Sequence, residues 1–419
     1  MNGTISISIR RPMLPKQENN QAVAPKWTIS TDAKLQAQVN NCFGRTNWEA
    51  ICKTASRVNG GQPCKALPYY THGGSSLVRL LEFEDGTRWI ARVQLLKSTP
   101  NTAHKIQAEI DTIALLKAQT KTPTPQVFGF ELGDENPAGV SFVLFEYFPG
   151  NSALDEARDY NRIDWSLIPF QYRQTFYRSI AAAHVQISSA RLPKIGTVTR
   201  SIGGDFTVGP IPGIGGPFET AASFMLAWAA RVQFPYQEEY LRKCVPPSQI
   251  DDILKGVDEF SDRLAKLVAS GKYFTCKGPF PLRHADLFYN NIIVSKSFEV
   301  LGIIDWEGAC TVPWELVDAP CFLSSVPRLL NPPGQYDESG QPLDQSEANR
   351  WADEQAYASI VREVEHHAKV DQKLSAMLLD KDTRDLASMI HLFAQGKMGF
   401  YSSALDYFEN KLGASAEDK

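Results

Sequence analysis

The sequence predicts an α+β fold in two lobes, a small β-rich N-terminal lobe and a larger, mainly helical C-terminal lobe. The chain has 419 residues, more than a single hydrophobic core usually holds. Short β-patterned segments are concentrated between residues 69 and 148, and helical patterns dominate after Gly150. We therefore expect a flexible segment over 1–30, an N-terminal lobe over 31–149, a C-terminal lobe over 150–410 and a flexible tail over 411–419.

The N-terminal lobe is expected to begin with two helices. Ser30 or Thr31 is placed to cap the first helix, and the second covers residues 48–58. Alternating apolar residues then predict a hairpin, whose strands are YYTHGGSSLVRLLEF and RWIARVQLL and whose turn is EDGT. A helix over residues 102–118 follows, and the TPTP run stops it because proline cannot continue a helix. Two further strands, VFGFEL and VSFVLFEYF, complete the lobe.

The C-terminal lobe shows helical periodicity over residues 171–189, 220–230 and 250–270. The segments HADLFYNNIIV and FEVLGIIDW interrupt the helices and predict a second, short hairpin. The stretch from Lys194 to Pro217 is rich in Gly, Pro and Ile, so we expect an ordered surface loop there.

The composition argues against several classes of function. Lysine and arginine total 43 against 47 acidic residues, a net charge of -4, which gives no electrostatic basis for binding nucleic acid. The seven cysteines are scattered without a CxxC pair, so neither a disulfide framework nor a zinc site is expected. No apolar run is long enough to span a membrane. A cytoplasmic protein is the simplest interpretation, although the acid-free start leaves a mitochondrial transit peptide as an alternative.

The segment from His284 to Glu307 carries the residues of a phosphoryl-transfer site. Asp286 is a candidate base for a hydroxyl proton, and Asn291 lies five positions later. The apolar strand that follows delivers Asp305, whose carboxylate is a hard oxygen ligand of the kind Mg²⁺ prefers. We expect Asn291 and Asp305 to bind the metal and His284 to brace the loop. The alternative is an ordinary loop in which Asp and Asn cap turns.

Candidate nucleotide contacts lie upstream of this segment. Gly73, Gly74 and Ser75 open the first strand of the hairpin, where the backbone can approach a phosphate closely, although a glycine pair there is also typical of an ordinary turn. Arg92 lies among apolar neighbours on the second strand, and a pair with Glu109 on the next helix would hold its cation over phosphate. The alternative is an Arg92 that points to solvent.

The segment at the end of the last N-terminal strand is a candidate adenine contact. Glu146 and Phe148 precede a Pro-Gly break, and their backbone groups are placed to face an adenine before the chain crosses to the second lobe. An edge strand that ends in a Pro-Gly turn explains the same residues.

Together these motifs resemble the aminoglycoside phosphotransferase and choline kinase-like family, and fungal members in particular. The resemblance covers about residues 70–325, through GGSSLVRL, WIARV, AEIDTIALLK, FVLFEYFPG, HADLFYNNIIV and GIIDWEGACTVPWELVDAP. It implies a bilobal protein-kinase-like fold that transfers phosphate from ATP, with Mg²⁺, to a hydroxyl of a small molecule. It assigns Asp286 as the catalytic base, Asn291 and Asp305 as metal ligands, and Glu109 as the partner of the strand cation.

Two departures from the family pattern leave another class of function open. Arg92 stands where the family usually has lysine, and a planar guanidinium meets phosphate differently from an ammonium. Ala285 occupies a usual glycine position. A catalytically silent, kinase-like binding protein is therefore the alternative. A protein kinase is disfavoured because no activation-loop-like stretch with an APE motif follows Asp305. The substrate and the oligomeric state are not determined by the sequence.

Overall fold

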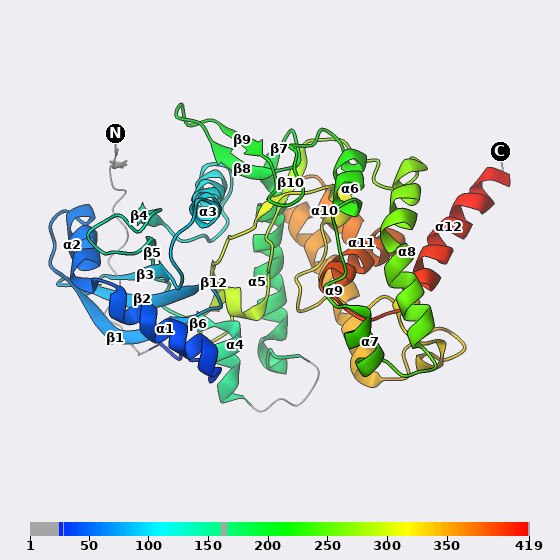
Figure 1. Ribbon diagram of the computed structural model, residues 1–419, viewed down its shortest axis with the longest axis horizontal. Coiled ribbons are helices and arrows are strands. Elements are labelled where there is room, and N and C mark those ends of the chain that lie inside the picture. Colours follow the sequence, from blue (N-terminus) through cyan, green and yellow to red (C-terminus); the bar gives the residue numbers. More distant parts are fainter. Residues whose placement is uncertain (1–24, 28, 161–165, 418–419) are drawn as a thin grey trace.

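The computed structural model describes residues 25–27, 29–160 and 166–417 (Figure 1). Within these ranges the chain is β-rich at its N-terminal end and mainly helical after residue 152, which confirms the predicted α+β class. The expected flexible segment over 1–30 lies almost entirely outside the described residues. None of the helices in the described ranges combines the length and apolar character that a membrane-spanning helix requires.

The N-terminal lobe is built on one antiparallel sheet and two covering helices. Its helices are α1 (Ala33–Arg45) and α2 (Trp48–Val58). The strands lie in the spatial order β1 (Cys64–His72), β2 (Ser76–Phe83), β3 (Arg88–Gln94), β5 (Phe142–Glu146) and β4 (Val127–Glu131). Asp32, rather than the expected Ser30 or Thr31, caps α1, because its carboxylate accepts the Leu35 N–H. Strand β1 starts earlier than predicted and tolerates Pro68, because it is an edge strand with an irregular register there.

The two faces of this sheet have different partners. Along β3 every second residue is buried, and Trp89, Ala91 and Val93 pack in one core with α1 and α2. Ile90 and Arg92 consequently point to the opposite face, where α3 (Pro100–Gln119) and the C-terminal lobe lie. Strand alternation thus places the Arg92 side chain on the side of the sheet that meets the second lobe.

The crossing between the lobes is closely packed. After β5 the chain forms β6 (Asn151–Ser152), which joins β11 (Ile292–Val294) and β12 (Val300–Ile303) in a small antiparallel sheet. A Cβ atom at Gly150 would collide with the Val294 carbonyl oxygen, and one at Gly302 would overlap the Phe148 ring. Both positions therefore require glycine. The β11–β12 pair is the short second hairpin that the sequence predicts.

The C-terminal lobe surrounds one large hydrophobic core, to which α3 also contributes. Its helices are α4 (Ala153–Glu156), α5 (Phe170–Ser189), α6 (Ala221–Ala229), α7 (Glu238–Cys244), α8 (Ile250–Ala269), α9 (Gln345–Ala368), α10 (Lys373–Leu379), α11 (Lys381–Ala394) and α12 (Tyr401–Glu417). Helix α12 thus extends past the expected lobe boundary at residue 410. A third sheet has the order β7 (Arg191–Leu192), β10 (Phe280–Arg283), β13 (Cys310–Thr311), β8 (Thr197–Arg200) and β9 (Phe206–Gly209).

The segment expected to be a surface loop, Lys194 to Pro217, contains the β8–β9 hairpin, so that prediction was wrong. Consecutive β-branched residues in TVTR and FTVG favour the two strands, and the turn between them includes Gly204 at φ +93°. The density of Gly and Pro over the whole stretch concealed these two short strands. In Figure 1 the hairpin lies beside α3, at the top of the molecule.

Candidate active site

The catalytic-loop candidates are held by hydrogen bonds within one short segment. Strand β10 leads into His284, and a 3-10 turn, Tyr289–Asn291, leads into β11. The Asn291 side chain is 4% exposed, and its Nδ2 donates to the backbone oxygen of Asp286 at 2.9 Å and to Asp286 Oδ2 at 3.0 Å. Asp286 itself is exposed. The amide nitrogen of Asn291 therefore fixes an accessible carboxylate. Its Oδ1 accepts from Asn290 Nδ2, and as an amide oxygen it can accept from one further partner.

His284 is a structural brace of the loop. Its Nδ1 accepts the Asp286 N–H at 3.1 Å, and its Nε2 lies 3.1 Å from the Ile304 carbonyl oxygen. Because an N–H only donates and a carbonyl only accepts, the ring must be neutral with its proton on Nε2. Burial agrees with this state, since it lowers the pKa of His284 to about 4. The ring ties the Asp286 loop to Ile304, which lies between the end of β12 and Asp305.

Asp305 follows β12 in a left-handed backbone conformation, with φ +63°. About half of its side-chain surface is exposed, 51%, and its neighbours are charged. Burial raises the pKa of the Asp305 carboxyl to about 6; Arg92 opposes this increase, while Glu109, Glu307 and Asp286 add to it. Several carboxylates therefore converge here with incomplete neutralisation, an environment that favours a bound cation.

Arg92, on strand β3, forms the ion pair with Glu109 that the sequence predicts. Arg92 Nη1 donates to Glu109 Oε1 at 3.0 Å, and Nη2 donates to Glu109 Oε2. The Glu109 side chain is only 2% exposed, and Arg92 is 12% exposed, with Asp305 Oδ1 3.6 Å from Nη1. The guanidinium also lies over the Phe145 ring. Arg92 thus reaches from the N-terminal sheet to α3 and to the Asp305 loop.

The remaining predicted nucleotide residues occupy a turn and the lobe crossing. Gly73, Gly74 and Ser75 connect β1 to β2, and no atom lies within 4 Å of a Cβ built on either glycine. Nothing inside the protein therefore requires glycine there. Glu146 Oε2 accepts the Gln126 N–H at 3.0 Å, so its carboxylate is engaged. The Phe148 ring packs against Gly302, as described above.

Three contacts at this site carry no signal in the sequence. The backbone N–H of Trp306 donates to Glu109 Oε1 at 3.2 Å, which ties α3 directly to the residue after Asp305. Lys105, on α3, pairs with Glu307 at 3.1 Å. Asn290 Nδ2 donates to Asn291 Oδ1 at 3.1 Å. The first two contacts join segments about 200 residues apart, a distance over which local patterns carry no information.

The donor atoms present fit a magnesium ion. Asn291 offers an amide oxygen and Asp305 a carboxylate, and Mg²⁺ in phosphate sites commonly takes only one or two protein oxygens. Among the described residues no group of three or more His, Cys, Asp or Glu side chains is arranged as a complete metal cage.

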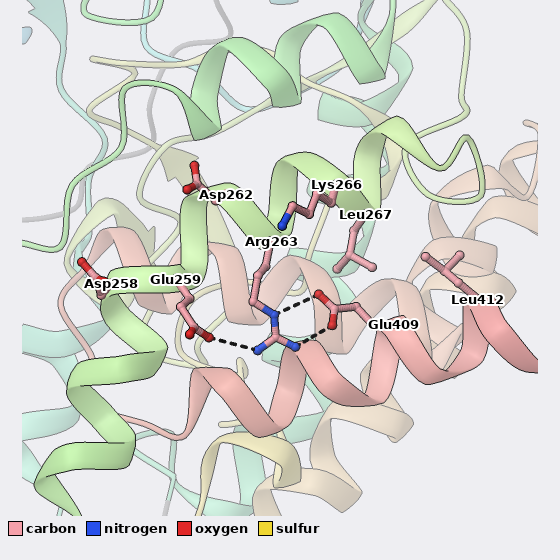
Figure 2. Close-up of a pocket in the computed structure, with 8 residues that line it drawn as sticks. All are labelled: Asp258, Glu259, Asp262, Arg263, Lys266, Leu267, Glu409 and Leu412. Atoms are coloured by element: carbon pink, nitrogen blue, oxygen red, sulfur yellow. Dashed lines mark hydrogen bonds and ion pairs between the residues drawn. The ribbon is translucent and has the colours of Figure 1, made fainter.

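One surface groove lies away from this chemistry. It has a volume of about 490 Å³ and lies between α8 and α12. Figure 2 shows Arg263 between Glu259 and Glu409; its Nε and Nη2 donate to the two Glu409 oxygens at 2.9 and 2.7 Å. No residue of the Asp286 loop or the Asp305 loop lines this groove. We interpret it as the contact between α8 and α12, which ion pairs stabilise.

Comparison with known proteins identifies the family. A model of the phosphotransferase enzyme family matches residues 69–315, which is more than half of the chain and includes every candidate site residue. The chain belongs to the phosphotransferase enzyme family. Its fold is the predicted α+β fold, with a five-stranded antiparallel sheet in the first lobe and a mainly helical second lobe.

Relatives of this phosphotransferase family member are distant. Two subtelomeric hrmA-associated cluster proteins of Aspergillus fumigatus strains are each 24% identical, over 66% of this chain and 64% of their own length. A Ralstonia eutropha protein assigned as an aminoglycoside phosphotransferase is 14% identical over 87% of this chain and 99% of its own, with a TM-score of 0.48. A Thermobifida fusca protein assigned as a fructosamine-3-kinase is 15% identical over 85% and 96%, with a TM-score of 0.40.

Proposed function

We propose that this phosphotransferase transfers the γ-phosphoryl group of ATP to a hydroxyl of a small molecule and uses Mg²⁺. The observation that carries the proposal is the convergence of three groups from separate elements. Asp286 comes from the loop after β10, Asp305 from the segment after β12, and the Arg92–Glu109 pair from the N-terminal lobe. Phosphoryl transfer requires a base, metal-binding oxygens and a cation for phosphate, and each has a candidate in this set.

Asp286 is the proposed general base. Its carboxylate is exposed, and the Asn291 amide holds one of its oxygens. Its backbone N–H is fixed by His284. A carboxylate held in one orientation accepts the proton of the attacking hydroxyl as the new O–P bond forms, while the nucleoside diphosphate leaves. His284 positions the loop and takes no proton, because its ring is neutral and its two nitrogens are already engaged.

Asn291 and Asp305 are the residues that would hold the metal. When bound, Mg²⁺ neutralises phosphate charge and positions the transferred group. Arg92 would place its guanidinium against the nucleotide phosphates, and Glu109 fixes the direction of that cation. The arginine in place of the usual lysine keeps a positive charge at this position and adds a planar set of donors.

Calorimetry with ATP, with and without Mg²⁺, tests the binding half of the proposal. We expect metal-dependent binding by the wild type and at least tenfold weaker binding by Asp305→Asn, since about 1.4 kcal/mol of lost metal contact corresponds to that factor. Asp258→Asn, an exposed acid in the groove of Figure 2, is the matched control and should bind like the wild type. No binding of ATP or GTP by the wild type would favour the catalytically silent binding protein.

Asp286→Ala tests the catalytic half. We expect phosphate transfer to be abolished, with Mg–ATP affinity close to that of the wild type, because the carboxylate acts on the hydroxyl and is not proposed to hold the nucleotide. The measurement is ATP turnover over a panel of hydroxyl metabolites. Undiminished turnover in Asp286→Ala would remove the assignment of the base while leaving the nucleotide site intact.

A further inference from the structure

The β8–β9 hairpin packs against α3, the helix that carries Glu109 (Figure 1). The backbone N–H of Arg200, at the end of β8, donates to Asp111 Oδ2 at 3.0 Å. The positive charge of the Arg200 side chain also lowers the pKa of Asp111. The hairpin belongs to the C-terminal lobe, so this bond joins α3 to the second lobe. The Asp111–Arg200 bond shares no atoms with the contacts that Glu109 makes with Arg92 and Trp306.

Asp111 is a buried carboxylate, 7% exposed, and both of its oxygens are engaged. Oδ2 accepts from Arg200, and Oδ1 accepts from Gln107 Nε2 at 2.8 Å. Burial raises the pKa of Asp111, so the position has an electrostatic cost that its two hydrogen bonds offset. A charged residue is rarely retained in such a place without a partner, and here the partner is a backbone amide of the other lobe.

Glu109 and Asp111 fix opposite sides of the same helix turn. Two residues correspond to about 200° of rotation around an α-helix, so their side chains leave in nearly opposite directions. Glu109 faces Arg92 and the Trp306 N–H, while Asp111 faces Arg200. A rotation of α3 that broke one set of bonds would also break the other. The two sides therefore act together on the orientation of the helix.

The hairpin is also connected to the catalytic loop through its sheet. Strand β8 pairs with β13, and β13 pairs with β10, the strand that ends at Arg283 immediately before His284. The Asp111–Arg200 bond thus ties α3 to a sheet whose next element is the Asp286 loop. The orientation of α3 is set relative to that loop.

We infer that Asp111 is a positioning residue for nucleotide binding: it anchors α3 to the β8–β9 hairpin so that Glu109 holds Arg92 in place for phosphate. This inference rests on the function proposed above. Asp111 does not touch the nucleotide, and its effect passes through Glu109 and Arg92.

The test measures Mg–ATP affinity in Asp111→Ala, Asp111→Asn and Arg200→Ala. Asp111→Ala removes the acceptor, and we expect an affinity about tenfold weaker, the scale of one lost hydrogen bond to a charged group. Asp111→Asn should restore most of the affinity, because its oxygen can still accept the Arg200 N–H and its NH₂ can face a rotated Gln107. Arg200→Ala keeps the backbone N–H that Asp111 accepts and removes only the guanidinium, whose charge lowers the pKa of Asp111, so we expect a smaller loss of affinity than in Asp111→Ala.

A double-mutant cycle distinguishes positioning from general damage to the fold. If Asp111 acts through Glu109, then Asp111→Ala should weaken binding little further in a Glu109→Gln background. Arg200→Pro, at the end of β8, removes the N–H that donates to Asp111. It therefore replaces Asp111→Ala in the test if Asp111→Ala does not fold. Wild-type affinity in Asp111→Ala, or full additivity with Glu109→Gln, would overturn the inference and leave the proposed function standing. Absence of nucleotide binding by the wild type would overturn both.

Discussion

Glu109→Ala should destabilise the protein strongly, because the Glu109 carboxylate is the main partner of a buried cation. Among the described residues, the substitution leaves the Arg92 guanidinium, 12% exposed, with Asp305 at 3.6 Å as its ion-pair partner and with the weaker attraction of Glu307. It also removes the acceptor of the Trp306 N–H. Breaking a buried ion pair by removing one partner costs about 3–5 kcal/mol. The remaining Asp305 contact places the expected loss of unfolding free energy near the lower end, about 3 kcal/mol.

Urea unfolding followed by tryptophan fluorescence measures this loss. Glu307→Ala is the matched control, because it also removes a carboxylate from an ion pair, here with Lys105, but the two side chains are 31% and 43% exposed. An exposed pair contributes about 0–1 kcal/mol. Glu109→Gln should fall between the two, since its amide oxygen still accepts one hydrogen bond, at a cost of about 1–3 kcal/mol.

The two partners of the Arg92–Glu109 ion pair should not contribute independently to stability. Arg92→Met combined with Glu109→Ala should cost less than the sum of the two single variants, because no buried charge is then left unpaired. Two results would refute the argument: a Glu109→Ala loss no larger than that of Glu307→Ala, or additive effects in the double variant. Either result would mean that water solvates Arg92 despite its low exposure.

Two further predictions concern packing and pH. Gly302→Ala should lower the unfolding free energy by about 1–3 kcal/mol, because its methyl group would overlap the Phe148 ring. The double variant with Phe148→Leu should regain much of this stability, and thermal unfolding measures both variants. Burial lowers the pKa of His184 to about 4, with Tyr357 as its hydrogen-bond partner; the unfolded chain therefore binds a proton between pH 6.5 and 4 that the folded chain does not. Stability should fall by up to about 3 kcal/mol from this group as the pH decreases through that window. Chemical denaturation measures the unfolding free energy at pH 7 and at pH 4.5. The decrease between the two pH values should be smaller in His184→Asn than in the wild type, and an equal decrease would contradict the assignment to His184.

The sequence by itself determined the elements and the local part of the site. The alternation in RWIARV decides that Arg92 lies on the opposite face of the sheet from Trp89, because successive side chains of a strand point to opposite faces. The short spacing between Asp286 and Asn291 decides that they share one loop, where their hydrogen bond forms. These features depend on neighbours within a few residues, so periodicity and turn chemistry are sufficient to predict them.

The tertiary structure alone decided the contacts between distant segments. The Trp306 N–H reaches Glu109 and the Arg200 N–H reaches Asp111 only because α3 is packed between the Asp305 loop and the β8–β9 hairpin. The donors are backbone groups, which every non-proline residue carries, so the side chains around them give no signal. The neutral state of His284 likewise follows from its two backbone partners and from burial. Such contacts are set by the packing of whole elements, which no short stretch of sequence specifies.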